Sequence, residues 1–382
     1  MNTAEPMQDA PGSVALITSH HAGTAGGTDP RHALERAGVP VALQLDVRQL
    51  ADLPPQGAVW QQAGCAAAVA AGGDGTVGTV ASHVAGTGLP LGILPLGTAN
   101  DVARSLDLPL TLPEAVAVIA RGHSTLMDLG CARPAGQEAG GEYFLHALTL
   151  GWNAAFAELA TNALRRQRWG KLTYAISAIE AIFTYRPLEV RIEMEDVAAS
   201  VYGLDFIAPP GASGSHSALA VKATGERRVV SGSVVNLGVV VTPVFGGRSN
   251  FRLPSVALRD QLLDVVVIEA PDPPRLQWFY DIMTGKRGAL GEGAGEAAAS
   301  EAAKHAAHAA KHAVEGDAAP MDKPGVWRFQ VRALRITTPE AAEPAAVTLD
   351  GEPRLRTPVD VRVEPDALRV YVPAPASGAG GG

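Results

Sequence analysis

The sequence is poor in the residues that would tie a protein to an oxidising compartment or to a structural metal. It has 2 cysteines, Cys65 and Cys131, and neither forms a Cys-x-x-Cys motif or a Cys/His pairing. A disulfide framework and a zinc site are therefore not indicated. We expect a reducing compartment.

Long apolar runs and an excess of positive charge are also absent. The most apolar segments, such as 234–244, are interrupted by asparagine, glycine, threonine and proline, and the first residues lack a basic start followed by an apolar stretch. The formal net charge is -8, which argues against binding of nucleic acid through phosphate neutralisation. We expect a cytoplasmic protein with no membrane span and no nucleic-acid partner.

What the chain does have is an alternation of strands and helices in its first third. Apolar runs predict strands at 13–18, 41–45, 66–71 and 91–94, and helices are expected around 30–37 and 78–85. Strands that alternate with helices form a parallel sheet covered on both faces. This part of the chain predicts a doubly wound, Rossmann-like nucleotide-binding domain.

After residue 128 the pattern changes to longer alternating segments. They lie at 189–195, 234–241, 262–269 and 329–337. Alternation of this kind indicates antiparallel sheet. The predicted fold class is α/β, with the N-terminal doubly wound domain followed by a C-terminal β-sandwich domain.

The predicted domain boundaries follow this change. Residues 1–128 form the doubly wound domain, and 129–365 form a β-rich domain. Residues 285–322 are an Ala-rich insertion with few large apolar side chains to bury, and 375–382 are a tail of small residues.

The strongest motif is Gly72-Gly73-Asp74-Gly75-Thr76, directly after a predicted strand and before a predicted helix. Glycines at this junction let backbone N–H groups approach phosphates, and the helix N-terminus favours an anion. Alone, such a segment is equally well explained as a tight turn. A nucleotide triphosphate site therefore needs a second signal.

The second signal follows the next strand, in Pro95-Leu96-Gly97-Thr98-Ala99-Asn100-Asp101. The carboxyl ends of strands in a doubly wound sheet share one crevice, so both loops can face one ligand. The pair of motifs resembles the catalytic domain of the diacylglycerol kinase, sphingosine kinase and bacterial lipid-kinase family. NAD kinases and phosphofructokinases share only the first, GGDGT-like turn.

The resemblance implies ATP and Mg²⁺ as cofactors and nucleotide-binding roles for the two loops. The implied binding residues are Gly72, Gly73, Asp74, Gly75, Thr76, Gly97, Thr98, Asn100 and Asp101. It also implies that the end of the chain, at 366–374, returns to the first domain, and that the active site lies in the cleft between the domains. Asp74 would hold the nucleotide metal through water.

Near the C-terminus, Leu349-Asp350-Gly351-Glu352-Pro353 resembles the family's closing pattern. The resemblance implies that Asp350 is the catalytic base and that Glu352 has a supporting catalytic role. Phosphoryl transfer needs a carboxylate that accepts the proton of the substrate hydroxyl. The alternative interpretation is a plain hairpin turn, for which Asp-Gly is a strong signal.

A third acidic segment, at 257–265, is similar to a family turn that holds a structural Mg²⁺. The match implies a carboxylate ligand from Asp260 and backbone carbonyl ligands from Ala257 and Leu262. Gln261 stands where the family has glycine, so a required positive φ would strain the turn or lose the ion. Both outcomes stay open.

The first loop also departs from the family. Ser19-His20-His21-Ala22-Gly23 stands where Asn-Pro-x-x-Gly is usual, which puts nucleotide affinity in doubt. The resemblance predicts a lipid kinase that binds its substrate peripherally at a membrane surface, and a basic-aromatic run at 165–171 could contact anionic headgroups. An NAD kinase and a catalytically silent lipid- or nucleotide-binding protein are the alternatives. A homodimer is left open.

Overall fold

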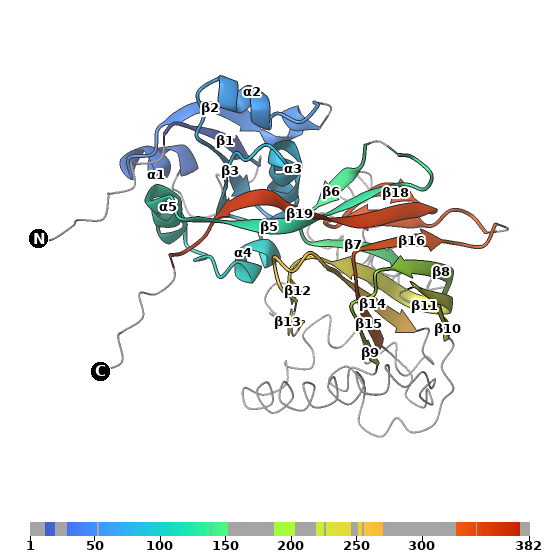
Figure 1. Ribbon diagram of the computed structural model, residues 1–382. Coiled ribbons are helices and arrows are strands. Elements are labelled where there is room, and N and C mark those ends of the chain that lie inside the picture. Colours follow the sequence, from blue (N-terminus) through green and yellow to red (C-terminus); the bar gives the residue numbers. More distant parts are fainter. Residues whose placement is uncertain are drawn as a thin grey trace, which may run out of the picture. The chain divides into compact units, whose positions relative to one another are not determined.

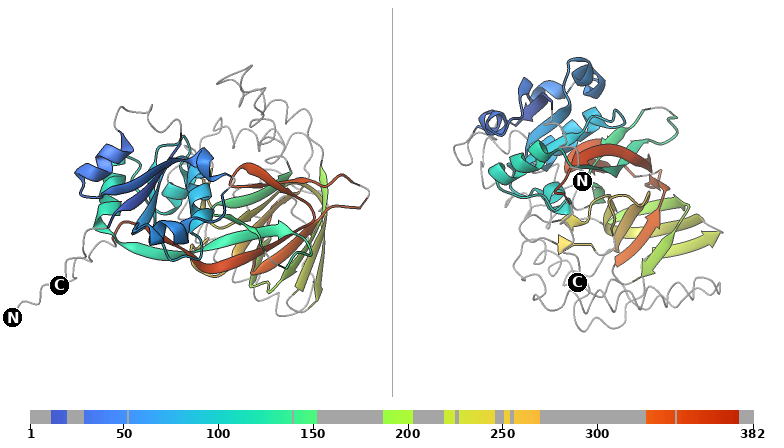
Figure 2. Two further views of the ribbon diagram at one scale, coloured as in Figure 1. Left: turned by 90° about the horizontal axis from the view of Figure 1, so that it is seen from above. Right: turned by 60° about the vertical axis from the view of Figure 1, so that its left-hand side comes forward.

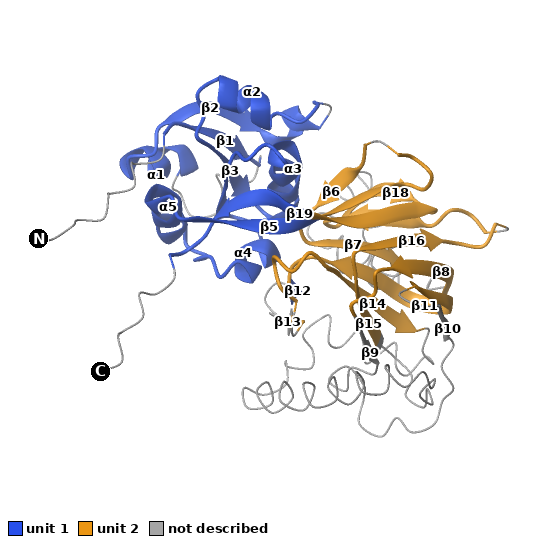
Figure 3. Cartoon of the chain, in the orientation of Figure 1, with its two compact units in different colours: residues 1–129, 244–250, 365–382 blue, residues 130–243, 251–364 orange. Residues whose placement is uncertain are grey.

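The computed structural model describes residues 12–19, 29–51, 53–138, 140–151, 187–202, 219–224, 227–245, 251–253, 256–269, 326–340 and 342–374. The chain divides into two compact units (Figure 3). Unit 1 comprises residues 1–129, 244–250 and 365–382, and unit 2 comprises residues 130–243 and 251–364. Our expectations for the loop at 20–23, the basic run at 165–171, the insertion and the tail fall outside the described residues.

Unit 1 is built from short strands and short helices (Figure 1). Its strands are β1 (Val14–Thr18), β2 (Val41–Asp46), β3 (Ala67–Gly72), β4 (Leu91–Pro95), β12 (Val244–Phe245), the start of β5 (Ser124–Pro134) and the end of β19 (Val359–Tyr371). Its helices are α1 (Pro30–Arg36), the 3-10 helix η1 (Val47–Leu50), α2 (Gly57–Gln62), α3 (Asp74–Val84), α4 (Asp101–Ser105) and α5 (Leu112–Arg121).

The sheet of unit 1 is parallel in the order β2-β1-β3-β4, with Val370 of β19 beside Leu91 of β4. Helices α1 and α5 lie on one face and α2 and α3 on the other (Figure 2). Strand β2 lies on one side of β1, and the strands that follow it in sequence, β3 and β4, lie on the other side. The direction of the strand order therefore reverses between β1 and β3. Ligands of doubly wound sheets bind at such a switch point, outside the carboxyl ends of the strands.

The residues of unit 1 explain these elements. Every residue of β3 is buried, as expected for a strand covered by helices on both faces. Helix α1 begins after Asp29, whose carboxylate accepts the Arg31 N–H, and has Pro30 in its first turn. Helix α5 ends at Gly122, which has a φ of 69°. The doubly wound domain expected from the sequence is confirmed.

One predicted boundary is wrong. We expected a helix from 78 to 85, but α3 already begins at Asp74, inside the GGDGT motif. The motif therefore supplies both the turn after β3 and the first turn of α3. Glycine and aspartate are weak helix formers in the middle of a helix, but in the first turn an aspartate is favoured by the free N–H groups and the positive end of the helix dipole.

Unit 2 consists of antiparallel strands (Figure 1). Besides its parts of β5 and β19, it contains β6 (Glu142–Phe144), β7 (Ala147–Gly151), β8 (Leu188–Glu195), β9 (Ala199–Tyr202), β10 (Leu219–Thr224), β11 (Arg227–Val240), β13 (Phe251–Arg252), β14 (Leu263–Glu269), β15 (Val326–Val331), β16 (Ala333–Thr337), β17 (Ala346–Leu349) and β18 (Glu352–Arg356). The predicted strand at 329–337 is two strands, because the chain bends at Arg332 and changes partners.

Strand β11 joins the two antiparallel layers of unit 2. Its first half pairs with β8 and β10, and its second half pairs with β7 and β14. The first layer continues through β16 to β19, and the second continues through β17 to β18 and through β15 to β9. The β-rich domain expected from the sequence is thereby confirmed. No helix in the described part of the chain is long and apolar enough to cross a membrane.

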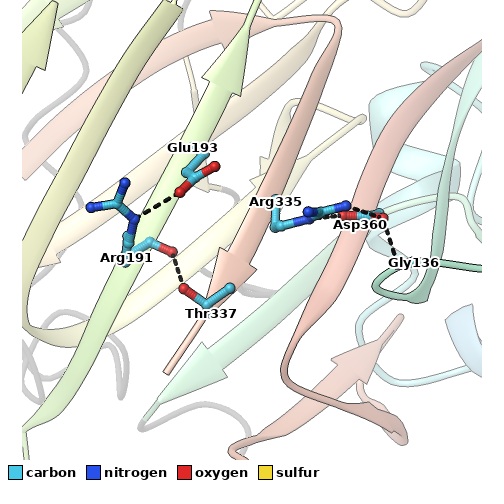
Figure 4. A network of polar contacts seen from close by, with 6 residues as sticks. All are labelled: Gly136, Arg191, Glu193, Arg335, Thr337 and Asp360. Carbon is cyan, nitrogen blue, oxygen red and sulfur yellow. Dashed lines mark hydrogen bonds and ion pairs between the residues drawn. The ribbon is translucent and has the colours of Figure 1, made fainter. Parts of the chain in front are cut away.

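The outer face of the first layer carries a charged network (Figure 4). Arg335 on β16 lies between Glu193 on β8 and Asp360 on β19 in the strand register, and it binds Asp360 through Nε and Nη2 at 2.6 and 3.0 Å. A hollow of about 290 Å³ adjoins this network, with Ala333 and Cys131 in its lining.

Candidate active site

The two glycine loops of unit 1 lie in contact. A Cβ atom added to Gly97 would come within 2.3 Å of the Gly73 Cα atom, and one added to Gly73 would lie 3.2 Å from Gly97 Cα. The Leu96 N–H donates to the Gly72 carbonyl at 2.9 Å, which extends the β3–β4 pairing into the loops. The structure thus brings together the two motifs that the sequence predicts to share a crevice.

Close packing also fixes the first turn of α3. A Cβ atom on Gly72 would lie 2.4 Å from the Thr76 Oγ1 atom. Thr76 is itself buried in α3. Glycine at 72 is therefore required for the helix to start directly at the end of β3, where its free N–H groups can face an anion.

Asn100 shapes the second loop. It has a left-handed backbone, with φ at 54°, and lies directly before α4. Its Oδ1 accepts the Gly97 N–H at 2.9 Å, and its Nδ2 donates to the carbonyls of Gly97 and Pro95 at 3.0 and 3.3 Å. These bonds make the Asn100 side chain a brace of the loop, while the neighbouring Thr98 is exposed.

Asp74 links the first loop to α4. The Val102 N–H donates to Asp74 Oδ1 at 3.0 Å, so the carboxylate caps the second position of that helix. Asp74 is half-buried and holds the two motifs together. Asp101 is also held inside the fold, with 8% of its surface exposed.

Sequence reasoning missed Arg104. This residue lies on α4, and its Nε donates to the Ala99 carbonyl at 3.2 Å. An arginine beside two glycine loops supplies the planar donors that bind phosphate oxygens. The sequence could have indicated it, because Arg104 lies about one helical turn after Asn100 and Asp101, which belong to the predicted loop.

In unit 2, Asp350 and Gly351 form the tip of the β17–β18 hairpin. Leu349 pairs with Glu352, and the two tip residues have φ values of 50° and 84°. Two successive positive φ values define a type I′ turn, which explains the Asp-Gly sequence. The hairpin interpretation of this motif is therefore right as a description of the backbone.

The Asp350 carboxylate has a second connection that a plain turn does not need. Its Oδ1 accepts the N–H groups of His146 and Ala147 at 2.8 and 3.1 Å, and its Oδ2 accepts the Leu145 N–H at 2.9 Å. Hydrogen bonds to an ionised carboxylate are stronger than neutral ones. Asp350 is thus an oriented anion on a tight turn.

Glu352, the predicted supporting residue, lies one step further along the hairpin. Its carboxylate is exposed and binds the Arg354 Nη2 atom at 2.7 Å. Exposed pairs of this kind contribute little to stability. The structure places Glu352 next to Asp350 in sequence and pairs it with a neighbouring cation.

The predicted metal turn is also in unit 2. Asp260 Oδ1 accepts the Leu262 N–H at 3.0 Å, and Gln261 has a φ of 62°. The turn does need the left-handed backbone that glycine adopts most easily, and a glutamine is held in it. Within the described residues there is no group of three or more His, Cys, Asp or Glu side chains that could hold a metal, so a site at Asp260, Ala257 and Leu262 would depend on backbone carbonyls.

The fold and the loops define the class of protein: a Rossmann-like sheet with paired glycine loops at its strand ends, combined with a β-rich unit. Residues 16–132, which contain both loops, match the model of the diacylglycerol kinase catalytic domain. This part of the chain is therefore similar to that domain, as the two motifs indicated.

Curated relatives cover the same part of the chain. A diacylglycerol kinase of Mycobacterium tuberculosis (strain ATCC 25618 / H37Rv) is 33% identical over 149 residues, which are 37% of this chain and 46% of that protein. A diacylglycerol kinase of Staphylococcus saprophyticus is 32% identical over 130 residues, 34% of this chain and 40% of that protein. The matched region therefore spans less than half the length of these relatives.

A solved structure extends the likeness of the fold to nearly the whole chain. The crystal structure of a diacylglycerol kinase from Bacillus anthracis str. Sterne aligns with a TM-score of 0.56 and 18% identity, over 94% of this chain and 97% of that one. At this level of identity, the alignment shows a shared fold for both units and leaves the chemistry to be argued from the residues.

Proposed function

We propose that the protein is an ATP-dependent lipid kinase that transfers the γ-phosphate of ATP to the hydroxyl of a diacylglycerol-like lipid. The contact between Gly73 and Gly97 carries this proposal. It brings two glycine loops and the start of α3 together at the carboxyl ends of β3 and β4, next to the switch point of the doubly wound sheet. Phosphates of a nucleotide are bound at this edge in this class of fold. The family match supports a lipid kinase over other nucleotide-binding proteins.

The residues of unit 1 would bind and orient the nucleotide. Backbone N–H groups of 72–76 would face the phosphates, and the missing Cβ atoms let them approach. Thr98 is exposed at the second loop and can donate its hydroxyl, while Arg104 can neutralise a phosphate oxygen. Asn100 and Asp101 would act by holding the loop in place.

A divalent ion, Mg²⁺ in our proposal, would neutralise charge on the phosphates. Asp74 is suited to hold it, because only its Oδ1 atom is bonded to the Val102 N–H and the carboxylate has a second oxygen. A single carboxylate with water and substrate phosphates is a usual way to bind Mg²⁺. The Asp260 turn remains a proposal for a separate, structural ion.

Asp350 would accept the proton of the lipid hydroxyl, with Glu352 in support. The three N–H groups that bind Asp350 fix the direction of its carboxylate, and a general base must be placed within hydrogen-bond reach of the proton that it removes. In this proposal the lipid stays at a membrane surface, and the enzyme binds that surface peripherally.

The test is phosphate transfer from γ-labelled ATP, with Mg²⁺, to a panel of hydroxyl lipids in mixed micelles, with NAD as a parallel acceptor. Labelled diacylglycerol or a related lipid is the expected product, and Asp74→Asn serves as the impaired control. Labelling of NAD alone would replace the proposal by an NAD kinase. ATP binding without any labelled product would indicate the silent binding protein.

A further inference from the structure

The three N–H groups that bind Asp350 belong to one short segment, Leu145–Ala147, whose position is fixed by further bonds. The Asp350 N–H donates to the Ala147 carbonyl at 2.9 Å, and the Val241 N–H donates to the His146 carbonyl at 3.0 Å. The segment is thus held from the hairpin on one side and from the end of β11 on the other.

A side-chain bond completes this arrangement. The His146 Nδ1 atom lies 2.6 Å from the Thr242 Oγ1 atom. Thr242 has 0% of its surface exposed. It lies two residues after Val240, the last residue of β11, which pairs with Ala147. The hydroxyl is therefore held by the sheet, and the half-buried imidazole is attached to it.

We propose that Thr242 and His146 are positioning residues for the phosphoryl-transfer reaction, acting through Asp350. The inference rests on the proposed function, because it concerns the residue that would accept the hydroxyl proton. The Thr242–His146 bond holds the side chain of His146 and so restricts the movement of its backbone. The N–H group of the same residue donates to Asp350 Oδ1 at 2.8 Å. Neither side chain needs to touch the lipid or the nucleotide.

The physical reason is the sensitivity of catalysis to small displacements. A displacement of about 1 Å at a reacting group can reduce a rate by about 10²-fold. The three hydrogen bonds orient the Asp350 carboxylate only while the N–H groups of Leu145, His146 and Ala147 keep their directions. Removing the Thr242 hydroxyl takes away one bond that holds the imidazole, and the range of carboxylate orientations widens.

Two pairs of variants separate this role from packing. Thr242→Val keeps the shape of the side chain and removes the hydroxyl, whereas Thr242→Ser keeps the hydroxyl. His146→Leu removes the polar contact, whereas His146→Asn keeps a polar atom close to the place of Nδ1. In Thr242→Val and His146→Leu we expect kcat to fall about 10-fold or more, while KM for ATP and for the lipid stays within about two-fold of the wild-type value. In Thr242→Ser and His146→Asn we expect kcat to stay close to the wild-type value.

A matched control is Thr357→Val in the same unit. Thr357 is a buried threonine whose hydroxyl accepts the Ala345 N–H at 2.9 Å and lies 2.9 Å from Thr338 Oγ1, away from the Asp350 segment. Its loss should lower the melting temperature to a similar extent as Thr242→Val and leave kcat per folded molecule unchanged. A kcat that falls equally in both variants would overturn the positioning role.

Amide hydrogen exchange gives a readout that does not depend on activity. Exchange at Leu145, His146 and Ala147 should be faster in Thr242→Val and unchanged in Thr357→Val. If the wild type labels no lipid, the proposed function fails, while the exchange rates still decide whether Thr242 holds these donors. Unchanged exchange in Thr242→Val would overturn the inference even in an active enzyme.

Discussion

The two units present their candidate groups in different ways. In unit 1 the loops meet through backbone atoms, because Gly73 and Gly97 leave no room for side chains. In unit 2 the candidate group is a side chain, Asp350, and the backbone serves to orient it through three N–H bonds. A backbone site depends on the absence of side chains, whereas a side-chain site depends on partners that are far away in sequence.

This difference predicts how each site fails. Substitutions in the unit 1 loops should act by steric conflict and affect nucleotide binding first. Substitutions around Asp350 should act on orientation and affect turnover first. The predictions below test this contrast, beginning with the largest expected effect.

The largest effect is expected for Gly97→Ala. The new methyl group would lie 2.3 Å from the Gly73 Cα atom, a distance at which one of the two backbones must move. Nucleotide binding measured by calorimetry should be lost, and activity should fall by more than about 10²-fold. Gly238→Ala is the control, because its nearest neighbour would be 3.9 Å away. Nucleotide binding that survives in Gly97→Ala would refute a backbone-built site.

Asp350→Asn should lower turnover by about 10²–10⁴-fold, the usual contribution of general-base catalysis, with ATP affinity nearly unchanged. The variant should also melt earlier. An asparagine keeps one carbonyl oxygen for two of the N–H groups but turns an amide toward the third, and a buried unpaired donor costs about 1–3 kcal/mol.

Since both effects are expected for Asp350→Asn, a lowered melting temperature alone does not distinguish a base from a turn residue. Turnover per folded molecule does, with the folded fraction measured by circular dichroism. Full turnover in the folded fraction would remove Asp350 from the mechanism.

Asp74 allows the charge of a carboxylate to be separated from its capping role. Asp74→Asn keeps an oxygen that can accept the Val102 N–H, so the melting temperature should barely change while most activity is lost with the charge. Asp74→Ala removes both the charge and the oxygen that caps the helix. Loss of a helix cap costs about 0.5–2 kcal/mol. Equal activity of Asp74→Asn and wild type would exclude the metal role.

Much of the fold could be predicted from the sequence because its signals are local. The strands of unit 1 are apolar runs, and the structure places their ends within about one residue of the prediction. The bend at Arg332 was missed although the alternation shifts there, with Phe329 and Val331 buried before it and Leu334 and Ile336 buried after it. The change of partner strand at the bend is recorded by no local pattern.

The site shows the same limit. The two loops could be predicted because the residues of each are contiguous in the sequence and form recognisable motifs. The partners of Asp350 could not, since the Leu145 N–H comes from a residue 205 positions earlier. His146 and Thr242 carry no motif and become visible only when the sheet places β7 beside β11.

A smaller, pH-dependent effect is expected inside unit 2. Asp264 is buried and binds the Arg328 Nε atom at 2.7 Å. Burial raises the pKa of Asp264 to about 6, although Arg328 acts in the opposite direction. Between pH 4 and 6 the folded protein therefore keeps a proton that the unfolded chain has released, and the stability due to this group falls as the pH rises through that window.

Asp264→Asn tests this sign. The free energy of unfolding of the wild type minus that of the variant should decrease by about 1–3 kcal/mol from pH 4 to pH 7. Urea denaturation at four pH values measures it. A difference that grows with pH would show that the ion pair with Arg328 outweighs burial.

The smallest effect is expected at the surface of unit 2, where Asp360 binds Arg335 (Figure 4). The hydrogen bond from Arg335 lowers the pKa of Asp360. Here the sign is the reverse of that for Asp264: the stability is present at neutral pH, above the ordinary pKa of the carboxyl, and is lost as the pH falls through the lowered value. Because the pair is partly exposed to solvent, Asp360→Asn should cost about 0.2–1 kcal/mol at pH 7 and almost nothing near pH 2. Raising the salt concentration should shrink the loss at pH 7, since screening weakens exposed pairs. A loss that persists unchanged at low pH and high salt would mean that Asp360 acts through its bond to the Gly136 N–H at 3.2 Å rather than through its charge.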